Sequence, residues 1–358
     1  MTEIALNNLG KKFGPFTALS AMNLTIADGE FVALLGPSGC GKSTTMNMIA
    51  GMLSPSEGEI LFDGRNVVNL PMARRGVGFV FQNYAIFTHM SVRENLAYCL
   101  RAQHVPRLER EKRLNAIAEL LQLTPLLDRP AAGLSVNILQ RIAIGRSAVV
   151  EPAIFLLDEP LSNVDAAFRA VMRGELKTLQ RQFRQTMVYV THDQLEAMTM
   201  ADRIAVMDQG KLLQTGTPLD IYNNPHNTFV ARFIGAPGMN ILDGVLAQSD
   251  RGMVVDLGPM GRAAVPPIAA RPGPILFGFR PEQVNPDPVG ALTLPVSFVE
   301  RIGARSILHL GAGAMQAKAV LDNDTAPPKP GEILRFSVDP GSIRLFDPAT
   351  GNAIGGAP

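Results

Sequence analysis

Cysteine and long hydrophobic runs are scarce in this sequence. Cys40 and Cys99 form no CxxC pair and have no histidine at ligand spacing. This argues against a disulfide framework or a zinc site and favours a reducing compartment. No apolar run approaches the roughly 20 residues that span a bilayer, and the first residues lack the basic-then-apolar order of a signal peptide. We therefore expect any membrane role to be peripheral, at the cytoplasmic face of the inner or plasma membrane.

An excess of charge of one sign is also missing. The formal net charge is +1, and no basic block or stripe is present, so nothing indicates a nucleic-acid partner. No repeat of solenoid length is visible. Hydrophobic residues make up 46% of the 358 residues and charged residues 18%. This composition allows a sizeable core, and the length suits two domains.

Short apolar runs alternate with helical stretches in the first part of the chain. The runs cover residues 30–35, 154–157, 187–190 and 203–207. Buried parallel strands have this pattern, and functional groups collect at their carboxyl ends. We therefore predict a doubly wound α/β core within residues 1–235.

Two regions depart from the alternating pattern. Between about residues 84 and 148 the sequence becomes helical, which predicts a helical subdomain inserted into the core. Residues 236–358 are rich in proline and glycine and carry short β-branched runs. These runs, at 252–257, 292–299 and 306–310, predict a second, all-β domain of small-barrel type.

A phosphate-binding motif lies at the first strand-to-helix turn. Residues 36–43, GPSGCGKS, satisfy G-x-x-x-x-G-K-[ST]. The glycines let backbone N–H groups surround a phosphate, Lys42 adds positive charge, and Ser43 offers a hydroxyl to Mg²⁺. The dipole of the following helix adds to the attraction for an anion. A chance match in this length is on the order of 1 in 100, so an ordinary glycine-rich turn is a weak alternative.

Two carboxylates follow the apolar run 154–157. Asp158 could hold Mg²⁺ through water, and Glu159 could polarise an attacking water. Without other motifs, an acidic pair at a strand end is usually just a solvated end of the strand. A single histidine at a strand end, such as His192, more often has a structural role than a catalytic one. Downstream of the phosphate-binding motif, the acidic pair predicts a hydrolytic centre.

With these motifs in this order, the chain resembles the ABC ATPase family along its whole length. By this resemblance Gln82 is the Q-loop glutamine, residues 161–165 (LSNVD) form the D-loop, and His192 is the switch histidine. Phe13 stands where the family places an aromatic that stacks on adenine, with a core phenylalanine as the alternative. The resemblance implies an α/β P-loop NTPase, that is, an ABC ATPase core with a helical subdomain, followed by an all-β OB-like domain.

The resemblance assigns three groups of site residues. The expected catalytic residues are Glu159, His192 and Gln82, and the expected Mg²⁺ ligands are Ser43, Gln82 and Asp158. ATP is expected to bind to Phe13, Gly36, Pro37, Ser38, Gly39, Cys40, Gly41, Lys42, Ser43, Thr44, Ser135, Asn137 and Asp165.

The signature segment departs from the family's L-S-G-G-Q. Residues 134–135 and 140–143 set the register, but Val136, Asn137 and Ile138 replace the two glycines and the glutamine. In the family this segment contacts the γ-phosphate held by the opposite subunit, where added bulk hinders backbone approach. Two explanations stay open: a homodimer with weakened contacts, or a heterodimer with a paralogue that has the consensus signature. A mainly regulatory ATP-binding subunit of such a pair is the alternative function.

The C-terminal region resembles that of maltose- and glycerol-phosphate-type importer ATPases. The resemblance lies in residues 232–240 (RFIGAPGMN), 279–282 (FRPE) and 345–354 (LFDPATGNAI). It implies a regulatory or dimerisation domain and an importer for a sugar, polyol, glycerol or glycerol phosphate, with a polyamine or iron importer as the alternative. The implied partners are a second ATPase subunit, two membrane permease subunits and, indirectly, an extracytoplasmic solute-binding protein.

Overall fold

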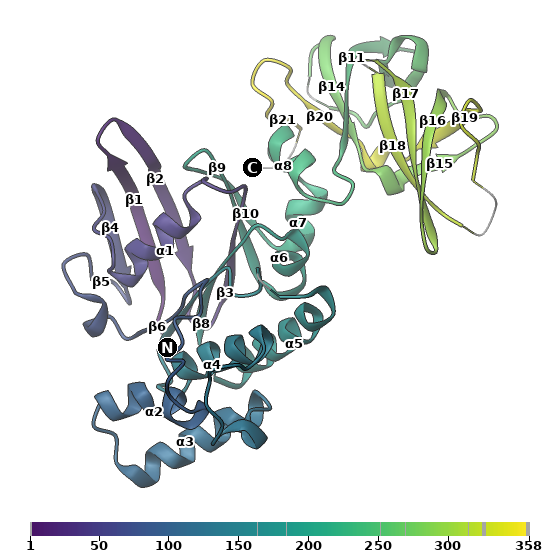
Figure 1. Cartoon of the computed structure of the whole chain (residues 1–358). Coiled ribbons are helices and arrows are strands. Elements are labelled where there is room, and N and C mark those ends of the chain that lie inside the picture. Colours follow the sequence, from purple (N-terminus) through teal and green to yellow (C-terminus); the bar gives the residue numbers. More distant parts are fainter. Residues whose placement is uncertain are drawn as a thin grey trace. The chain divides into compact units, whose positions relative to one another are not determined.

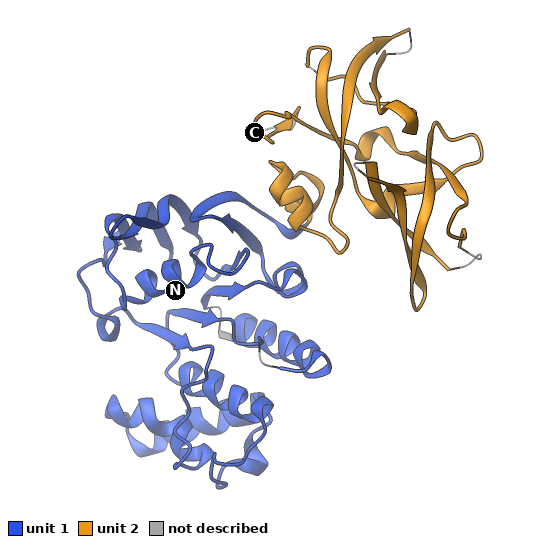
Figure 2. Cartoon of the chain, turned by 45° about the horizontal axis from the view of Figure 1, so that its top comes forward, with its two compact units in different colours: residues 1–218 blue, residues 219–358 orange. Residues whose placement is uncertain are grey.

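The computed structural model describes residues 2–162, 164–183, 185–250, 252–268, 270–313, 315–323 and 327–355. Its contacts divide the chain into two compact units, residues 1–218 and 219–358 (Figure 2). The sequence analysis put the domain limit at residue 235, whereas the contacts group helix α8 (Thr228–Phe233) with the C-terminal strands. Arg280 explains this grouping, because its guanidinium donates to the carbonyl oxygens of Ala231 and Ile234.

The first unit contains two sheets with one shared core. An antiparallel sheet has the order β2-β1-β4-β5. A second sheet has the order β10-β9-β3-β8-β7-β6, and only β10 runs antiparallel to its neighbour. The strands are β1 (Ile4–Phe13), β2 (Phe16–Ile26), β3 (Phe31–Leu35), β4 (Glu57–Phe62), β5 (Arg65–Asn66), β6 (Val77–Val80), β7 (Ile154–Asp158), β8 (Thr186–Thr191), β9 (Arg203–Asp208) and β10 (Lys211–Gly216).

The four predicted apolar runs lie in the middle of the second sheet, as β3, β7, β8 and β9. Every residue of β3 and β8 is buried, as expected for parallel strands covered on both faces. Helix α1 (Lys42–Ala50) contacts β2 of the first sheet and β7 and β8 of the second (Figure 1). Met46 and Ile49 of α1 belong to the core that both sheets share. The α/β core is therefore confirmed.

The predicted helical subdomain contains α2 (Val92–Ala102), α3 (Arg107–Leu120) and α4 (Val136–Ala148). A capping box begins α2: Ser91 Oγ accepts from Glu94 N, and Glu94 Oε2 accepts from Ser91 N. The helices pack closely at Gly145, where a Cβ would lie 2.8 Å from a methyl carbon of Leu96. The remaining helices of the unit are α5 (Ala166–Phe183) and α6 (Gln194–Met200), with 3₁₀ turns at Met72–Arg74 and Thr124–Leu126.

The second unit begins with α7 (Pro218–Asn223) and α8 and continues as two antiparallel sheets. Their orders are β13-β12-β11-β14-β20-β21 and β15-β19-β16-β17-β18, and one hydrophobic cluster joins them. The all-β region is therefore confirmed. The strands are β11 (Asn240–Ser249), β12 (Gly252–Asp256), β13 (Arg262–Ala264), β14 (Gly273–Phe279), β15 (Val284–Pro286), β16 (Leu292–Ile302), β17 (Arg305–Ala312), β18 (Met315–Asp322), β19 (Ile333–Val338), β20 (Arg344–Phe346) and β21 (Ala353–Ile354).

None of the helices in the described ranges has both the length and the hydropathy that crossing a bilayer requires.

Candidate active site

The segment from Gly36 to Gly41 connects β3 to α1 in a tight loop. A Cβ on Gly36 would lie 2.1 Å from the carbonyl oxygen of Met207, so no larger residue fits there without a shift of backbone. Gly39 and Gly41 have φ values of 80° and 104°, which residues with a side chain rarely adopt. The buried Cys40 fills space inside the loop, and burial raises the pKa of its thiol. The loop therefore needs glycine at the two motif positions, Gly36 and Gly41, and at Gly39 between them.

Lys42 is the first residue of α1 and is only 5% exposed. Its ammonium donates hydrogen bonds to the carbonyl oxygens of Gly36 (2.7 Å) and Pro37 (2.8 Å). The positive charge therefore lies inside the concave side of the loop, at the N-terminus of a helix. An anionic oxygen binds an ammonium more strongly than a neutral carbonyl does, so a phosphate can replace these partners.

Phe13, at the end of β1, lines a hollow of about 460 Å³ together with Thr44 of α1 and Asp158 of β7. The ring is 49% exposed, and Lys11 Nζ lies 5.1 Å from its centroid. This exposure rules out the alternative of a core phenylalanine. Phe16, across the turn from Phe13, is 62% exposed and is not among the described residues that line this hollow.

The predicted Mg²⁺ ligands gather near the end of β7. Ser43 Oγ donates to Asp158 Oδ1 across 3.1 Å. Burial raises the pKa of the Asp158 carboxyl, and the hydrogen bond from Ser43 opposes that rise. Gln82 lines a hollow of about 350 Å³ together with Asp158. Hydroxyl, carboxylate and amide oxygens are hard ligands, so this donor set fits Mg²⁺.

The three predicted catalytic residues meet at one oxygen atom. Glu159 Oε2 lies 3.4 Å from Gln82 Nε2 and 3.2 Å from His192 Nδ1. Glu159 directly follows β7, and its φ of 43° is a left-handed value that is unusual for a residue with a side chain. Its N–H donates to the carbonyl of Val190, which holds this sharp turn beside β8. Strained backbone of this kind is characteristic of functional sites.

The predicted signature and D-loop residues contact one another. Ser135 precedes α4 with extended backbone, and the Asn137 Nδ2 group donates to Asp165 Oδ2 across 3.1 Å. Asp165 Oδ1 accepts from Phe168 N, and these hydrogen bonds lower the pKa of the Asp165 carboxyl. Among the described residues, none of these groups hydrogen-bonds the phosphate-binding loop. Asn163 of the predicted D-loop lies outside the described residues.

Known proteins are similar to this chain over nearly its whole length. The sequence model of the ABC transporter family matches residues 19–162, and that of the TOBE domain matches residues 277–346. The sn-glycerol-3-phosphate import ATP-binding protein UgpC 1 of Rhizobium johnstonii is 41% identical over 360 residues, which cover 99% of this chain and 96% of the relative. The chain belongs to the ABC transporter family.

Two other relatives agree with this membership. The trehalose/maltose import ATP-binding protein MalK of Thermococcus litoralis is 41% identical over 375 residues, 99% of this chain and all of that protein (100%). A bacterial ABC transporter cassette, solved as a dimer, has a TM-score of 0.55 and 31% identity over 60% of this chain and 98% of the cassette. The similarity to the solved cassette covers the length of one ATPase cassette, and this chain has the C-terminal unit in addition.

Arg169 of α5 is a site residue that the sequence analysis missed. Its Nη2 group donates to the carbonyl of Val164 across 2.9 Å, and its Nη1 group lies 3.2 Å from Asp193 Oδ2. The guanidinium thus joins the D-loop of this ABC protein to the residue after His192. The available signal was its spacing, one helical turn after Asp165.

Glu196 of α6 is a second missed residue and is only 3% exposed. Its Oε2 atom accepts hydrogen bonds from Tyr189 Oη (2.8 Å) and Thr191 Oγ1 (2.7 Å), and burial raises the pKa of this carboxyl. Because Thr191 precedes His192, the buried carboxyl holds the backbone that carries the histidine. Again the spacing, one turn after His192, was the available signal.

Proposed function

We propose that this chain is the ATP-hydrolysing subunit of an ABC importer for a sugar, polyol, glycerol or glycerol phosphate. The observation that carries the proposal is the approach of Gln82 and His192 to one oxygen of Glu159. The Ser43–Asp158 pair and the phosphate-binding loop belong to the same unit. Similarity over nearly the whole chain to ATP-binding proteins of glycerol-phosphate and trehalose/maltose import supports the solute class.

In the proposed reaction, water attacks the γ-phosphorus of ATP, the bond to the ADP oxygen breaks, and phosphate is released. Glu159 orients the water and accepts its hydrogen bond, while Lys42 and the first N–H groups of α1 stabilise the charge on the phosphate oxygens. The Nδ1 atom of His192 lies 3.2 Å from Glu159 Oε2. From this position His192 donates a hydrogen bond to an oxygen of the γ-phosphate. Phe13 packs against the adenine from the rim of the hollow that it shares with Thr44.

Ser43 and Asp158, together with Gln82, would hold Mg²⁺. When bound, this ion neutralises charge on the phosphate oxygens and orients them. Among the described residues, no group of three or more His, Cys, Asp or Glu side chains offers a competing metal site. The fit of the site near β7 rests on its hydroxyl, carboxylate and amide oxygens, which are the donors that a hard cation prefers.

A second ATPase subunit completes the proposed machinery. Ser135, Asn137 and Asp165 would face the nucleotide of that subunit, and a related cassette forms a dimer. Val136 and Asn137 begin α4 and carry side chains at the two positions where the family has glycine. The side chain of Val136 is 46% exposed. If the second subunit is a paralogue with the consensus signature, the site that includes this chain's own signature is the weaker of the two. If it is another copy, both sites are weakened equally.

The remaining proposed partners are two membrane permeases and, indirectly, an extracytoplasmic solute-binding protein, with this chain peripheral at the cytoplasmic face. The test is uptake of labelled glycerol 3-phosphate, maltose and trehalose by vesicles that hold the reconstituted complex and enclosed ATP. We expect uptake of at least one solute, and none when the complex carries Lys42→Ala. The exposed Lys112→Ala change is the matched control. ATP hydrolysis without uptake of any of the three solutes would refute the solute class, and absence of hydrolysis would refute the ATPase function.

A further inference from the structure

The C-terminal unit contains a cavity of about 530 Å³ that the proposed ATPase reaction does not use. It lies between the start of β11 with its preceding segment and the strands β16, β17 and β18. Pockets for small molecules commonly have volumes of about 300–1,000 Å³. The cavity is therefore large enough for a small metabolite.

The charged side chains that line this cavity are both cations, while the Glu300 carboxylate lies outside the lining, where it is hydrogen-bonded to His309 Nε2. Arg232 and Lys318 line it, and none of the other described lining residues is aspartate or glutamate. Within the described part of the chain, neither cation forms an ion pair, whereas Arg262 and Arg305 of the same unit pair with Asp256 and Asp322. The two lining cations outnumber the one carboxylate beside the wall, and the positive potential of this concave surface favours an anion.

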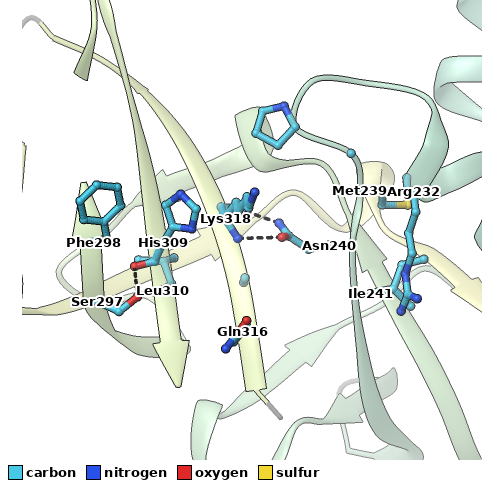
Figure 3. A pocket seen from close by; sticks show the side chains of 13 residues that line it. Arg232, Met239, Asn240, Ile241, Ser297, Phe298, His309, Leu310, Gln316 and Lys318 are labelled. Carbon is cyan, nitrogen blue, oxygen red and sulfur yellow. Dashed lines mark hydrogen bonds between the residues drawn. The ribbon is translucent and has the colours of Figure 1, made fainter. Parts of the chain in front are cut away.

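The backbone around Lys318 is held firmly. Asn240 is 8% exposed, and its side-chain amide donates to the Lys318 carbonyl (2.8 Å) and accepts from the Lys318 N–H (2.7 Å). Figure 3 shows this pair of bonds between β11 and β18. Ser297 Oγ also donates to the His309 carbonyl (2.9 Å), which joins β16 to β17 in the cavity wall. The wall is therefore preorganised, which reduces the entropy that binding loses.

An exposed aromatic ring forms one side of the cavity. Phe298 is 56% exposed, and its ring centroid lies 5.6 Å from that of His309. In Figure 3, Phe298 and Arg232 lie on opposite sides of the group, with His309, Lys318 and Asn240 between them. The cavity thus offers an apolar face to a carbon skeleton and cationic donors to a charged group.

We propose that this cavity binds a small organic phosphate. A phosphate monoester carries close to two negative charges and three acceptor oxygens, which match two cations and the neighbouring polar groups better than one carboxylate does. The phosphate lies at Lys318, the carbon skeleton packs against Phe298, and Arg232 adds to the positive potential from the other side of the cavity. The proposal concerns the C-terminal unit alone and does not depend on ATP hydrolysis.

The test is calorimetric titration of the full-length protein with glucose 6-phosphate and phenyl phosphate, with inorganic phosphate and glucose as partial ligands. Lys42→Ala protein is used in parallel, because its phosphate-binding loop cannot account for the signal. We expect one organic phosphate to bind equally to wild type and Lys42→Ala. Its Kd should rise about tenfold or more in Lys318→Met and by a smaller factor in Arg232→Gln. Phe298→Ala should weaken the organic phosphate but leave inorganic phosphate unchanged.

Arg301→Gln is the matched control, because Arg301 is exposed on β16 and lies outside the cavity lining. Protection of Lys318 from acetylation by the bound phosphate, measured by mass spectrometry on the wild-type protein, tests the site without any variant. The proposal is overturned if neither organic phosphate binds, or if binding disappears in Lys42→Ala. It is also overturned if Arg301→Gln weakens binding as much as Lys318→Met, or if inorganic phosphate binds as tightly as the organic phosphates.

Discussion

The side-chain amide of Asn137 donates a hydrogen bond of 3.1 Å to Asp165 of the same chain. The bond joins the first turn of α4 to Asp165. Asp165 also caps the N-terminus of α5, because its Oδ1 atom accepts a hydrogen bond from Phe168 N. Asn137 stands where the family signature has glycine, which has no side chain to make this bond. The altered signature therefore has a local partner of its own, in addition to its extra bulk.

Restoring the signature tests the consequence of this difference. We expect Val136→Gly/Asn137→Gly/Ile138→Gln to raise the ATPase rate of the lone chain about tenfold or more, because backbone N–H groups then reach the γ-phosphate. The complete complex should change little if a paralogue supplies an intact signature. Phosphate release measures both rates. Val171→Gly, at an exposed position of α5, controls for the cost of glycine in a helix. High activity of the unmodified lone chain, with little gain on repair, would favour the homodimer.

Glu159→Gln should separate ATP binding from hydrolysis. The amide keeps the shape of the carboxylate but accepts a proton poorly, so kcat should fall by about 10²–10⁴-fold while nucleotide affinity is retained. Phosphate release and binding of a fluorescent ATP analogue measure the two effects. The surface change Glu119→Gln should alter neither. Full turnover by Glu159→Gln would show that another group orients the water.

Phe13→Ala should weaken ATP binding selectively. Stacking of a base on an aromatic ring contributes about 1–3 kcal/mol, so the KM for ATP should rise roughly 5- to 150-fold while kcat changes little. Phe16→Ala is a close control, because Phe16 is even more exposed but lies outside the lining of the hollow. Equal KM values for Phe13→Ala and the wild type would refute the stacking role.

Arg169→Gln should lower kcat by about tenfold and leave the KM for ATP unchanged, because it separates the D-loop from Asp193 without touching the phosphate loop. Arg169→Lys should recover only part of the rate. Lysine keeps the positive charge, but its ammonium lacks the forked guanidinium that reaches both acceptors. Arg173→Gln, one turn further along α5, is the control. If the rate loss merely follows a fall in Tm, and lysine restores nothing, Arg169 has only a structural role.

Arg280→Met should destabilise the C-terminal unit by about 3 kcal/mol or more. Arg280 is 2% exposed, donates to the carbonyls of Tyr222, Ala231 and Ile234, and lies 4.0 Å from the Tyr222 ring centroid. Methionine leaves these buried acceptors without their donor. Urea unfolding, with hydrogen exchange of α8 and β14, measures the loss.

Arg305→Met is the comparison, because its ion pair with Asp322 lies on the surface and should contribute less than about 1 kcal/mol. Equal destabilisation by the two changes would contradict the role of Arg280 in holding α8.

The structure shows two features that the sequence alone did not determine, the exposure of Phe13 and the limit between the two units. Phe13 could have been a core residue, but β1 ends at the rim of a hollow and leaves its ring half exposed. The domain limit was placed where the composition changes, at residue 235, although contacts hold α8 to the later strands. A change in composition marks a change in local structure, and it does not record long-range hydrogen bonds such as those of Arg280.

The sequence by itself determined the phosphate-binding loop, the buried strands and the order of the catalytic motifs. These features depend on contiguous residues, whose backbone freedom and apolar pattern act locally. Only the tertiary structure brought Gln82, Glu159 and His192 together and joined Asn137 to Asp165. For the first group the reason is the order β8-β7-β6, which places the ends of strands that are far apart in the sequence beside one another. That order follows from how helices and strands pack across the whole unit, and many packings are compatible with the same local pattern.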